Sequence, residues 1–342
     1  MNTSELNKLT PCRIIIFGAG SVGCYVGARL LSAGANVTFV GRPRMRETLQ
    51  QHPLLATDYQ GFKFETRLQP NQYQTDAACA ANADLVLVTV KSAATETAGL
   101  QLAEFIRPGT AVISLQNGIS NSARLEKAIP DAQILAGMIA FNVLHQHPGH
   151  FHHGTEGHLM ATRHPSLNSA LPWFNKAGLP LQLRDDMVSV MWSKLLLNLN
   201  NPVNALSGVP LLEQLSQRNY RRCLAMAQDE TLALLKAARI PIVKLTGLPM
   251  PLIPTIMRLP DWIFARLAKT MLAIDPVARS SMWEDLEAGR ATEIDWINGE
   301  VIKLAHALGR DAPVNQHLTR LIHDCEQQRR NWTADELLSE LS

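Results

Sequence analysis

A lysine and several asparagines interrupt a leucine-rich stretch, MWSKLLLNLNNPVNAL, at residues 191–206. If this stretch is one helix, Lys194, Asn198 and Asn201 fall at positions i, i+4 and i+7 on one face, opposite the tryptophan and the leucines. An ammonium group flanked by amides is suited to donate a proton to a polar substrate that the amides orient. The alternative is a structural lysine at a helix edge, with its charged end in solvent.

A carboxylate in a later segment is a candidate partner for this lysine. Apolar residues follow helical spacing from residue 281 to 308, and Glu293, four residues before Ile297, falls on the core-facing stripe of one predicted helix. A buried carboxylate is unfavourable unless a cation or donor lies nearby. We therefore predict that Glu293 lies beside Lys194. The alternative is a structural ion pair between Glu293 and Arg290.

Ser281 begins the same segment with the pattern Ser281-Met282-Trp283-Glu284, which predicts a capping box at the start of the helix. A hydroxyl and free amides at a helix start also bind anions, such as the carboxylate of a substrate. Ser281 is therefore a candidate for either role.

A glycine-rich turn follows the first β-branched run of the chain. RIIIF at 13–17 predicts a strand, the helical pattern runs from residue 22 to 33, and NVTFV at 36–40 predicts a second strand. Between them, Gly18-Ala19-Gly20-Ser21-Val22-Gly23 matches the GxGxxG pattern. There Gly18 permits a tight turn, Gly20 lets amides approach a pyrophosphate, and Gly23 lets the helix lie close to the strand. The context favours a dinucleotide site over a ligand-free turn.

The residues after the second predicted strand indicate which dinucleotide is bound. Sites for NAD usually place an acidic residue there, whereas this chain reads Val40-Gly41-Arg42-Pro43-Arg44. A guanidinium group pairs with the 2′-phosphate of NADP, so Arg42 favours NADPH as the cofactor, with Arg44 as a weaker candidate.

The wider pattern predicts two domains. Apolar runs at 84–90 and 111–115 alternate with helix-like segments, as in a parallel sheet covered on both faces. Strand patterns cease after about residue 185, and helical periods continue from there. We predict an α/β Rossmann-type domain over residues 12–185 and an all-α domain over 186–330. A proline-rich stretch at 240–275 predicts a broken helical connection on the second domain, with a dimer or membrane-surface contact as alternatives.

Composition excludes several classes of protein. The 342 residues carry a net charge of only +2 with scattered basic residues, which argues against a nucleic-acid partner. No apolar run approaches the roughly 20 residues that span a bilayer, and the first eleven residues do not resemble a signal peptide. Five dispersed cysteines predict neither disulfides nor a thiolate metal site, which favours a reducing, cytoplasmic compartment.

Histidines crowd into one stretch around Pro148-Gly149, which raises the question of metal binding. The stretch resembles a polar hairpin closing the first domain, and no acid pair or cysteine accompanies it, so we expect no metal. These histidines are His145, His147, His150, His152, His153 and His158.

Taken together and in order, these motifs resemble the ketopantoate reductase family, also called 2-dehydropantoate 2-reductases, over nearly the whole chain. The lysine segment and the serine-to-TEID segment are far more specific than the glycine loop. The motifs are GAGSVG (18–23), VTVK (88–91), LQNG (115–118), MWSKLLLN (191–198) and SSMWEDLEAGRATEIDWINGE (280–300).

The resemblance implies NADPH-dependent reduction of a 2-keto acid in a cleft between a Rossmann domain and a helical domain like that of 6-phosphogluconate dehydrogenase. It implies that Lys194 protonates the ketone oxygen and that Glu293 lies near lysine, cofactor and substrate. Lys91 and Asn117 would border the nicotinamide half of the site, and Asn198 and Ser281 would bind substrate. From residue type alone, Lys91 is equally a surface lysine at a strand end, and Asn117 a turn residue.

Two departures from the family pattern bear on the substrate. The lysine segment is one residue shorter before Pro202 than the common form, so either Asn198 or Asn201 faces the substrate, with Asn201 favoured by helical phase. Pro210-Leu211 stands where many members have an asparagine after a proline. Ketopantoate is the first candidate substrate, another branched or bulky 2-keto acid is the second, and an NADP-binding protein without turnover is the third hypothesis. A homodimer is compatible with the sequence.

Overall fold

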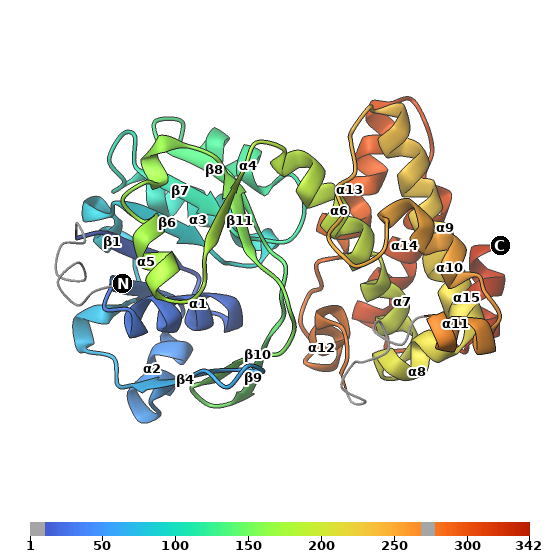
Figure 1. The fold of residues 1–342 in the computed structure, drawn as a ribbon, viewed down its shortest axis with the longest axis horizontal. Helices are drawn as coiled ribbons and strands as arrows, with labels where there is room; N and C mark the ends of the chain where they lie inside the picture. Colours follow the sequence, from blue (N-terminus) through green and yellow to red (C-terminus); the bar gives the residue numbers. More distant parts are fainter. Residues whose placement is uncertain (1–10, 268–277) are drawn as a thin grey trace. The chain divides into compact units, whose positions relative to one another are not determined.

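The computed structural model describes residues 11–267 and 278–342 (Figure 1). The chain divides into two compact units, the first ending at Met187 and the second beginning at Val188. The first is an α/β unit and the second is a helical unit, as the sequence predicts.

A mostly parallel eight-stranded sheet forms the centre of the α/β unit, in the order β12-β11-β8-β7-β6-β1-β2-β5. Neighbouring strands run parallel except β11, which is antiparallel to β8. The chain moves from β1 to β2 on one side and returns to β6 on the other, so the order reverses at β1, where doubly wound sheets bind ligands. The strands are β1 (Arg13–Phe17), β2 (Asn36–Val40), β5 (Tyr73–Gln74), β6 (Leu85–Val88), β7 (Ala111–Ser114), β8 (Gln133–Ile139), β11 (Leu159–Thr162) and β12 (Leu181–Arg184).

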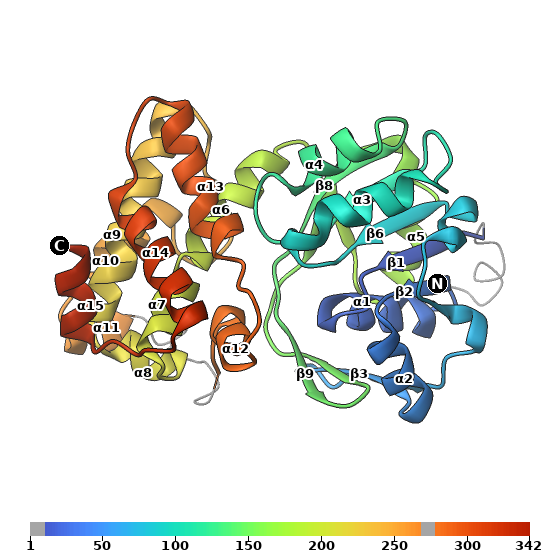
Figure 2. The same cartoon turned by 180° about the vertical axis from the view of Figure 1, so that it is seen from behind.

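Helices cover both faces of this sheet, which explains why its strands read as continuous apolar runs. In β1, Ile14 and Ile16 enter one core with α1 (Ser21–Ser32) and α5 (Leu171–Lys176). Ile15 and Phe17 enter a second core with α3 (Thr95–Ala103) and α4 (Asn121–Ala128). Figure 1 shows α1 and α5 in front of the sheet. Figure 2, which is the view from the opposite side, shows α3 and α4 in front of it. The four predicted strands are confirmed, whereas the antiparallel β11 was not predicted.

A second, four-stranded sheet in the same unit has the order β4-β3-β10-β9. The hairpin predicted for the histidines is confirmed, since β9 and β10 pair in antiparallel fashion, and β10 also pairs in parallel with β3. Within residues 11–267 and 278–342, no group of three histidine, cysteine or acidic side chains is placed to hold a metal ion. The strands are β3 (Leu54–Asp58), β4 (Lys63–Thr66), β9 (Val143–His147) and β10 (His150–His153).

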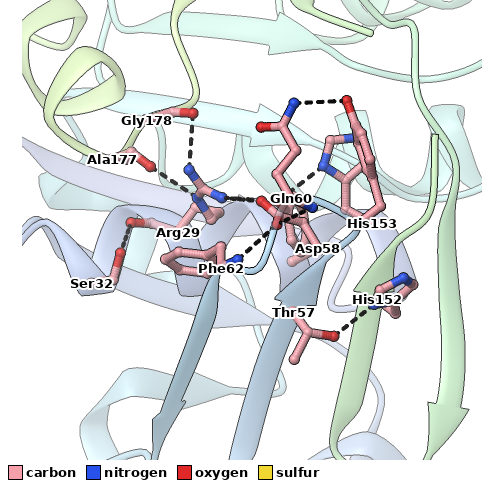
Figure 3. Close-up of polar contacts among 12 residues, drawn as sticks. Arg29, Ser32, Thr57, Asp58, Gln60, Phe62, His152, His153, Ala177 and Gly178 are labelled. Carbon is pink, nitrogen blue, oxygen red and sulfur yellow. Dashed lines mark hydrogen bonds and ion pairs between the residues drawn. The ribbon is translucent and has the colours of Figure 1, made fainter. Parts of the chain in front are cut away.

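A buried arginine joins the two sheets, and no local sequence pattern indicates it. Arg29 of α1 donates to the carboxylate of Asp58 at the end of β3, 2.9 Å away, and to the carbonyls of Ala177 and Gly178 just before β12 (Figure 3). Its guanidinium carbon also lies 3.8 Å from the centroid of the Phe62 ring. One side chain therefore connects α1, the small sheet and the edge of the main sheet.

The helical unit is built around α9, the longest of its described helices. Helices α7, α8, α10, α13, α14 and α15 all pack against α9. Every described strand lies before this unit, and no described helix is both long and apolar enough to cross a membrane. Its α-helices are α6 (Met187–Asn198), α7 (Asn200–Ser207), α8 (Leu211–Ser216), α9 (Arg218–Ala237), α10 (Ile253–Met257), α11 (Asp261–Leu267), α12 (Ser281–Glu287), α13 (Ile294–Ala307), α14 (Pro313–Gln327) and α15 (Ala334–Leu341).

The proline-rich stretch packs on this unit as a broken connection, as predicted. Short helices α10 and α11 lie within it, and residues 268–277 are outside the described part of the chain. Arg221 of α9 is fully buried and donates to the carbonyls of Met257 and Leu259 in this stretch. It also donates to the carbonyl of Leu215 in α8. It also pairs with Asp261 at 2.9 Å. A single arginine thus satisfies carbonyls that the broken backbone leaves without helical partners.

Candidate functional site

The glycine loop is held at the carboxyl end of β1 by bonds to both neighbouring strands. The amides of Gly18 and Ala19 donate to the carbonyl of Val40, the last residue of β2, at 2.9 and 3.1 Å. On the other side, the Thr89 hydroxyl donates to the carbonyl of Gly18 at 2.7 Å, just after β6. The loop therefore lies at the point where the strand order reverses.

Each glycine of the loop has a distinct steric reason. Gly18 has φ +122°, and an added Cβ would lie 2.5 Å from the Val90 nitrogen. A Cβ on Gly23 would lie 2.2 Å from the Gly18 carbonyl oxygen, so the helix can approach the strand only at a glycine. A Cβ on Gly20 would meet nothing within 4 Å. The space at Gly20 is thus open, whereas the other two glycines are required by packing.

The start of α1 fits a dinucleotide pyrophosphate. Gly20 is the N-cap residue without a side-chain cap hydrogen bond, and the first turn, which contains Ser21, Val22 and Gly23, carries no acidic residue. Amides in a first helical turn have no partner within the helix, and they attract anions. The loop and the helix start are therefore compatible with the cofactor that the sequence predicts.

Arg42 lies at the same edge of the sheet, two residues beyond Val40. It is exposed, it serves as the N-cap residue of α2 (Pro43–Gln51), and its carbonyl accepts a hydrogen bond from the Tyr73 hydroxyl at 3.2 Å. Because Val40 also bonds the glycine loop, Arg42 and the loop lie at the ends of two adjacent strands.

Lys91 and Asn117 follow β6 and β7, which are neighbours in the sheet. The hydroxyl of Ser92 donates to the Asn117 carbonyl at 2.9 Å, which joins the two segments directly. Lys91 is exposed and Asn117 is half-buried. The structure thus places both residues at the carboxyl edge of the sheet, where the resemblance implies the nicotinamide half of the site.

A buried polar network beneath Asn117 was missed by sequence reasoning. The amide of Asn121 donates to the Ser92 hydroxyl at 3.1 Å and to the Asn117 carbonyl, while its oxygen accepts from Thr95 at 2.8 Å. Gln116 donates to Thr95 at 2.6 Å. Buried polar groups require hydrogen-bond partners, so the short polar residues next to the LQNG motif could have indicated such a network.

In the helical unit, Lys194 lies near the middle of α6 and is half-buried, while Trp192, Leu195 and Leu196 are buried, as predicted. Desolvation lowers the pKa of Lys194 from its ordinary 10.5 to about 8, and the negative charge of Glu293 raises it, which offsets part of the effect. The electrostatic influence of Glu293 on Lys194 agrees with the predicted proximity of the pair. Such perturbed groups are typical of reactive sites.

The prediction that Glu293 lies within one continuous helix was wrong. The segment is two helices, and Glu293 is the N-cap residue of α13 instead of an interior position of a single helix. Gly289 ends α12 with φ +61°; its amide donates to the Leu286 carbonyl and that of Arg290 to Asp285, which is a Schellman motif.

The alternative partner for Glu293 is engaged elsewhere. Arg290 pairs with Asp285 at 3.0 Å, across the turn that ends α12. The structural ion pair considered for Arg290 therefore forms with a different carboxylate.

The predicted stripe of Lys194, Asn198 and Asn201 on one helix also needs correction. Helix α6 ends at Asn198, and α7 begins at Asn200. Pro202 has no amide hydrogen to donate to the Asn198 carbonyl, and its ring disfavours a straight helix there. Asn198 and Asn201 are both half-buried, and Leu199 between the two helices has right-handed helical angles, φ −61° and ψ −11°.

The predicted capping role of Ser281 belongs to its neighbour. Ser280 is the N-cap residue of α12, and its hydroxyl accepts from the Trp283 amide at 3.2 Å. Ser280 also donates to the Asn201 carbonyl, and its amide donates to the Asn204 side chain at 2.8 Å. Ser281 is the exposed first residue of the helix. Its hydroxyl is thus not used as the cap, and the start of α12 is tied to α7.

A doubly wound sheet with this glycine loop is typical of oxidoreductases that bind a dinucleotide cofactor, and the helical unit adds a lysine of lowered pKa. Two family models match the chain: Ketopantoate reductase PanE/ApbA over residues 14–165 and its C-terminal domain over 186–326. The chain belongs to this family of 2-keto acid reductases.

Individual relatives match over nearly the whole chain. The 2-dehydropantoate 2-reductase of Pyrococcus horikoshii is 26% identical over 315 residues, which are 91% of this chain and 96% of that protein. The structure of a PanE/ApbA family ketopantoate reductase from Ralstonia eutropha has a TM-score of 0.79 at 26% identity and covers 93% of this chain and 99% of its own. A D-mandelate dehydrogenase solved with NADH and anilino(oxo)acetate has a TM-score of 0.76 at 21% identity over 93% of this chain and 99% of its own, and thus shares the fold.

Proposed function

We propose that this chain reduces a 2-keto acid with NADPH, with Lys194 as the proton donor, and that 2-dehydropantoate (ketopantoate) is its first candidate substrate, giving pantoate for pantothenate biosynthesis. The observation that carries the proposal is the lysine on α6 whose pKa is lowered to about 8 and is influenced by Glu293. The match of both family domains supports the choice of substrate class.

NADPH, when bound, would supply the hydride that reduces the carbonyl carbon of the substrate. The Lys194 ammonium donates a proton to the carbonyl oxygen and stabilises the negative charge that develops there. Glu293 favours the charged form of Lys194 and so keeps the acid protonated near neutral pH. The proposed binding groups for the substrate are Asn117, Asn198, Asn201 and Ser281, and those for the cofactor are residues 18–23, Arg42, Lys91, Asn117 and Glu293.

A second candidate substrate is another branched or bulky 2-keto acid. Leu211 begins α8 directly after Pro210, so this position offers no amide side chain to a hydroxylated substrate. A pocket without a hydrogen-bonding group for the substrate hydroxyl discriminates less between a hydroxylated keto acid and one that lacks the hydroxyl.

A panel of 2-keto acids, assayed with NADPH and NADH in parallel, tests the proposal. Ketopantoate with NADPH is expected to give the highest kcat/KM. A higher value for an unhydroxylated branched or aromatic 2-keto acid would favour the second candidate, and oxidation of neither cofactor with any keto acid would reject the proposed function. Light scattering of the purified protein tests whether it forms a homodimer.

Replacing Arg42 with alanine is expected to raise the Kd for NADPH by roughly 10- to 100-fold, since a charge-assisted bond to the 2′-phosphate contributes about 1.5–3 kcal/mol. The Kd for NADH should stay near its original value because NADH has no 2′-phosphate. Fluorescence titration with each cofactor measures both constants. Arg44→Ala tests the weaker candidate and should raise the Kd for NADPH by less than Arg42→Ala does. Equal losses for both cofactors in Arg42→Ala would contradict NADPH selectivity.

The rate of keto-acid reduction is expected to depend on pH through Lys194, whose pKa of about 8 lies below the ordinary lysine value because of desolvation. Reduction needs the ammonium form, so kcat/KM should be flat below this pKa and fall about tenfold per pH unit above it. Oxidation of the hydroxy acid needs the neutral amine and should show the opposite limb. Parallel pH profiles of reduction and oxidation check this. If both reactions became slower on the same side of this pKa, the assignment would be contradicted.

A further inference from the structure

Glu293 occupies a junction between helices, and this raises the question of what fixes its carboxylate. It is the N-cap residue of α13, yet its side chain makes no capping hydrogen bond to the helix. The backbone on either side, namely Thr292 before it and the first turn of α13 after it, sets the point from which its side chain extends.

A contact from α14 holds the backbone on the first side. The amide of Thr292 donates to Oε1 of Glu326 at 2.7 Å. Thr292 is buried, and the side chain of Glu326 is only 18% exposed, so this bond is largely shielded from solvent. The Thr292 hydroxyl in turn accepts from the amide of Ile294 at 3.3 Å, across Glu293 itself.

A second contact from the same helix holds the other side. Nδ1 of His323 lies 3.0 Å from Oε2 of Glu326, and its Nε2 lies 3.0 Å from Oδ1 of Asp295 in the first turn of α13. The residues on both sides of Glu293 are therefore tied to α14 through one connected chain, Thr292, Glu326, His323 and Asp295.

In this series of contacts, each charged group favours the ionised form of its neighbour. Desolvation lowers the pKa of His323, but hydrogen bonds to Glu326 and Asp295 outweigh it and raise the pKa overall. Desolvation raises the pKa of Glu326, and its bonds from Thr292 and His323 outweigh that effect and lower it. The imidazolium and carboxylate forms are thus favoured together, and hydrogen bonds between charged groups are stronger than neutral ones.

We infer that Glu326 and His323 are positioning residues, which hold the Thr292–Asp295 segment so that the Glu293 carboxylate stays within electrostatic reach of Lys194. The inference rests on the proposed function for its effect on catalysis. Its structural part, the distance between Glu293 and Lys194, is independent of turnover.

The direct measurement is the titration of Lys194 by NMR of isotope-labelled lysine, with the signal assigned by its absence in Lys194→Arg. Glu293 raises the pKa of Lys194, so Glu293→Gln should lower the titration midpoint. Glu326→Ala and His323→Ala should lower it in the same direction by a smaller amount. Glu326→Gln retains a carbonyl oxygen for the Thr292 amide, so its Lys194 midpoint should lie closer to that of the original protein.

Two comparisons separate positioning from a general loss of structure. His317→Ala is the matched control, because His317 is also on α14 and lies 3.5 Å from a carboxylate, that of Glu340 on α15. It should leave the Lys194 midpoint unchanged. In a Glu293→Gln background, Glu326→Ala should cause no further change, because residues that act through a common partner are not additive.

Turnover provides the second readout. Glu326→Ala is expected to lower kcat by roughly 10- to 100-fold with KM little changed, since small misplacements of catalytic groups reduce rates to this extent. An unchanged Lys194 midpoint in folded Glu326→Ala and His323→Ala would overturn the inference. A shifted midpoint in a protein that reduces no keto acid would instead support the positioning and reject the proposed function.

Discussion

Replacing Lys194 with alanine is expected to lower kcat for keto-acid reduction by roughly 100- to 10,000-fold, the range that loss of a positioned general acid produces. Alanine removes both the proton donor and the cation that stabilises the developing alkoxide, and water cannot be held in the same place by the apolar neighbours on α6. The Kd for NADPH should change little, because Lys194 is not among the proposed cofactor groups, all of which except Glu293 lie on the α/β unit. Single-turnover kinetics and cofactor titration measure the two effects separately.

A lysine elsewhere in the same unit provides the control. Lys303 lies on α13, its side chain is 59% exposed, and it pairs with Glu300 at 3.2 Å. Lys303→Ala should retain turnover within about twofold, since Lys303 is not among the proposed substrate- or cofactor-binding groups. Equal turnover in Lys194→Ala and Lys303→Ala would refute the role of Lys194.

Replacing Arg29 with methionine is expected to lower the free energy of unfolding of the α/β unit by about 3–5 kcal/mol, the effect of leaving a buried charge without its partner. The side chains of Arg29 and Asp58 are only 9% and 6% exposed, so the remaining carboxylate would be poorly solvated. The carbonyls of Ala177 and Gly178 would also lose their donors. Hydrogen exchange of peptides from α1 and β3 under increasing denaturant reports this unit by itself.

Two further variants make this prediction specific. Adding Asp58→Asn to Arg29→Met should recover part of the loss, because no unpaired charge remains. Arg163→Met removes an exposed pair with Asp185, whose side chains are 56% and 76% exposed, and should cost no more than about 1 kcal/mol. A loss in Arg29→Met no larger than in Arg163→Met would show that the buried pair does not hold the two sheets together.

The parts of the fold that were predictable are those whose signals are local. The run RIIIF, the glycine loop and NVTFV specify a strand, a turn, a helix and a strand within thirty residues. Both faces of β1 are buried, so the apolar run is continuous and unambiguous. The small sheet was not predicted because β3 and β4 are short and partly polar, and β3 pairs with β10, which lies far along the chain.

The sequence proposes residues for the candidate site, but it does not predict their local geometry. Helical spacing of apolar residues continues through the breaks near Pro202 and Gly289, so periodicity alone suggested two uninterrupted helices. Gly289 is a stop signal, and the capping serine is displaced by one residue from Ser281 to Ser280. Helix boundaries are the least certain part of such patterns. The positions of Glu326 and His323 depend on packing between helices that no local signal describes.

The place of Glu293 between α12 and α13 gives the two members of the pair different supports. Lys194 is embedded in the body of a helix, so moving it requires the surrounding core to repack. Glu293 stands on the short connector between two helices, and both sides of that connector are tied to α14. A substitution on α14 can therefore change the acid of the pair while the core around the lysine stays as it is.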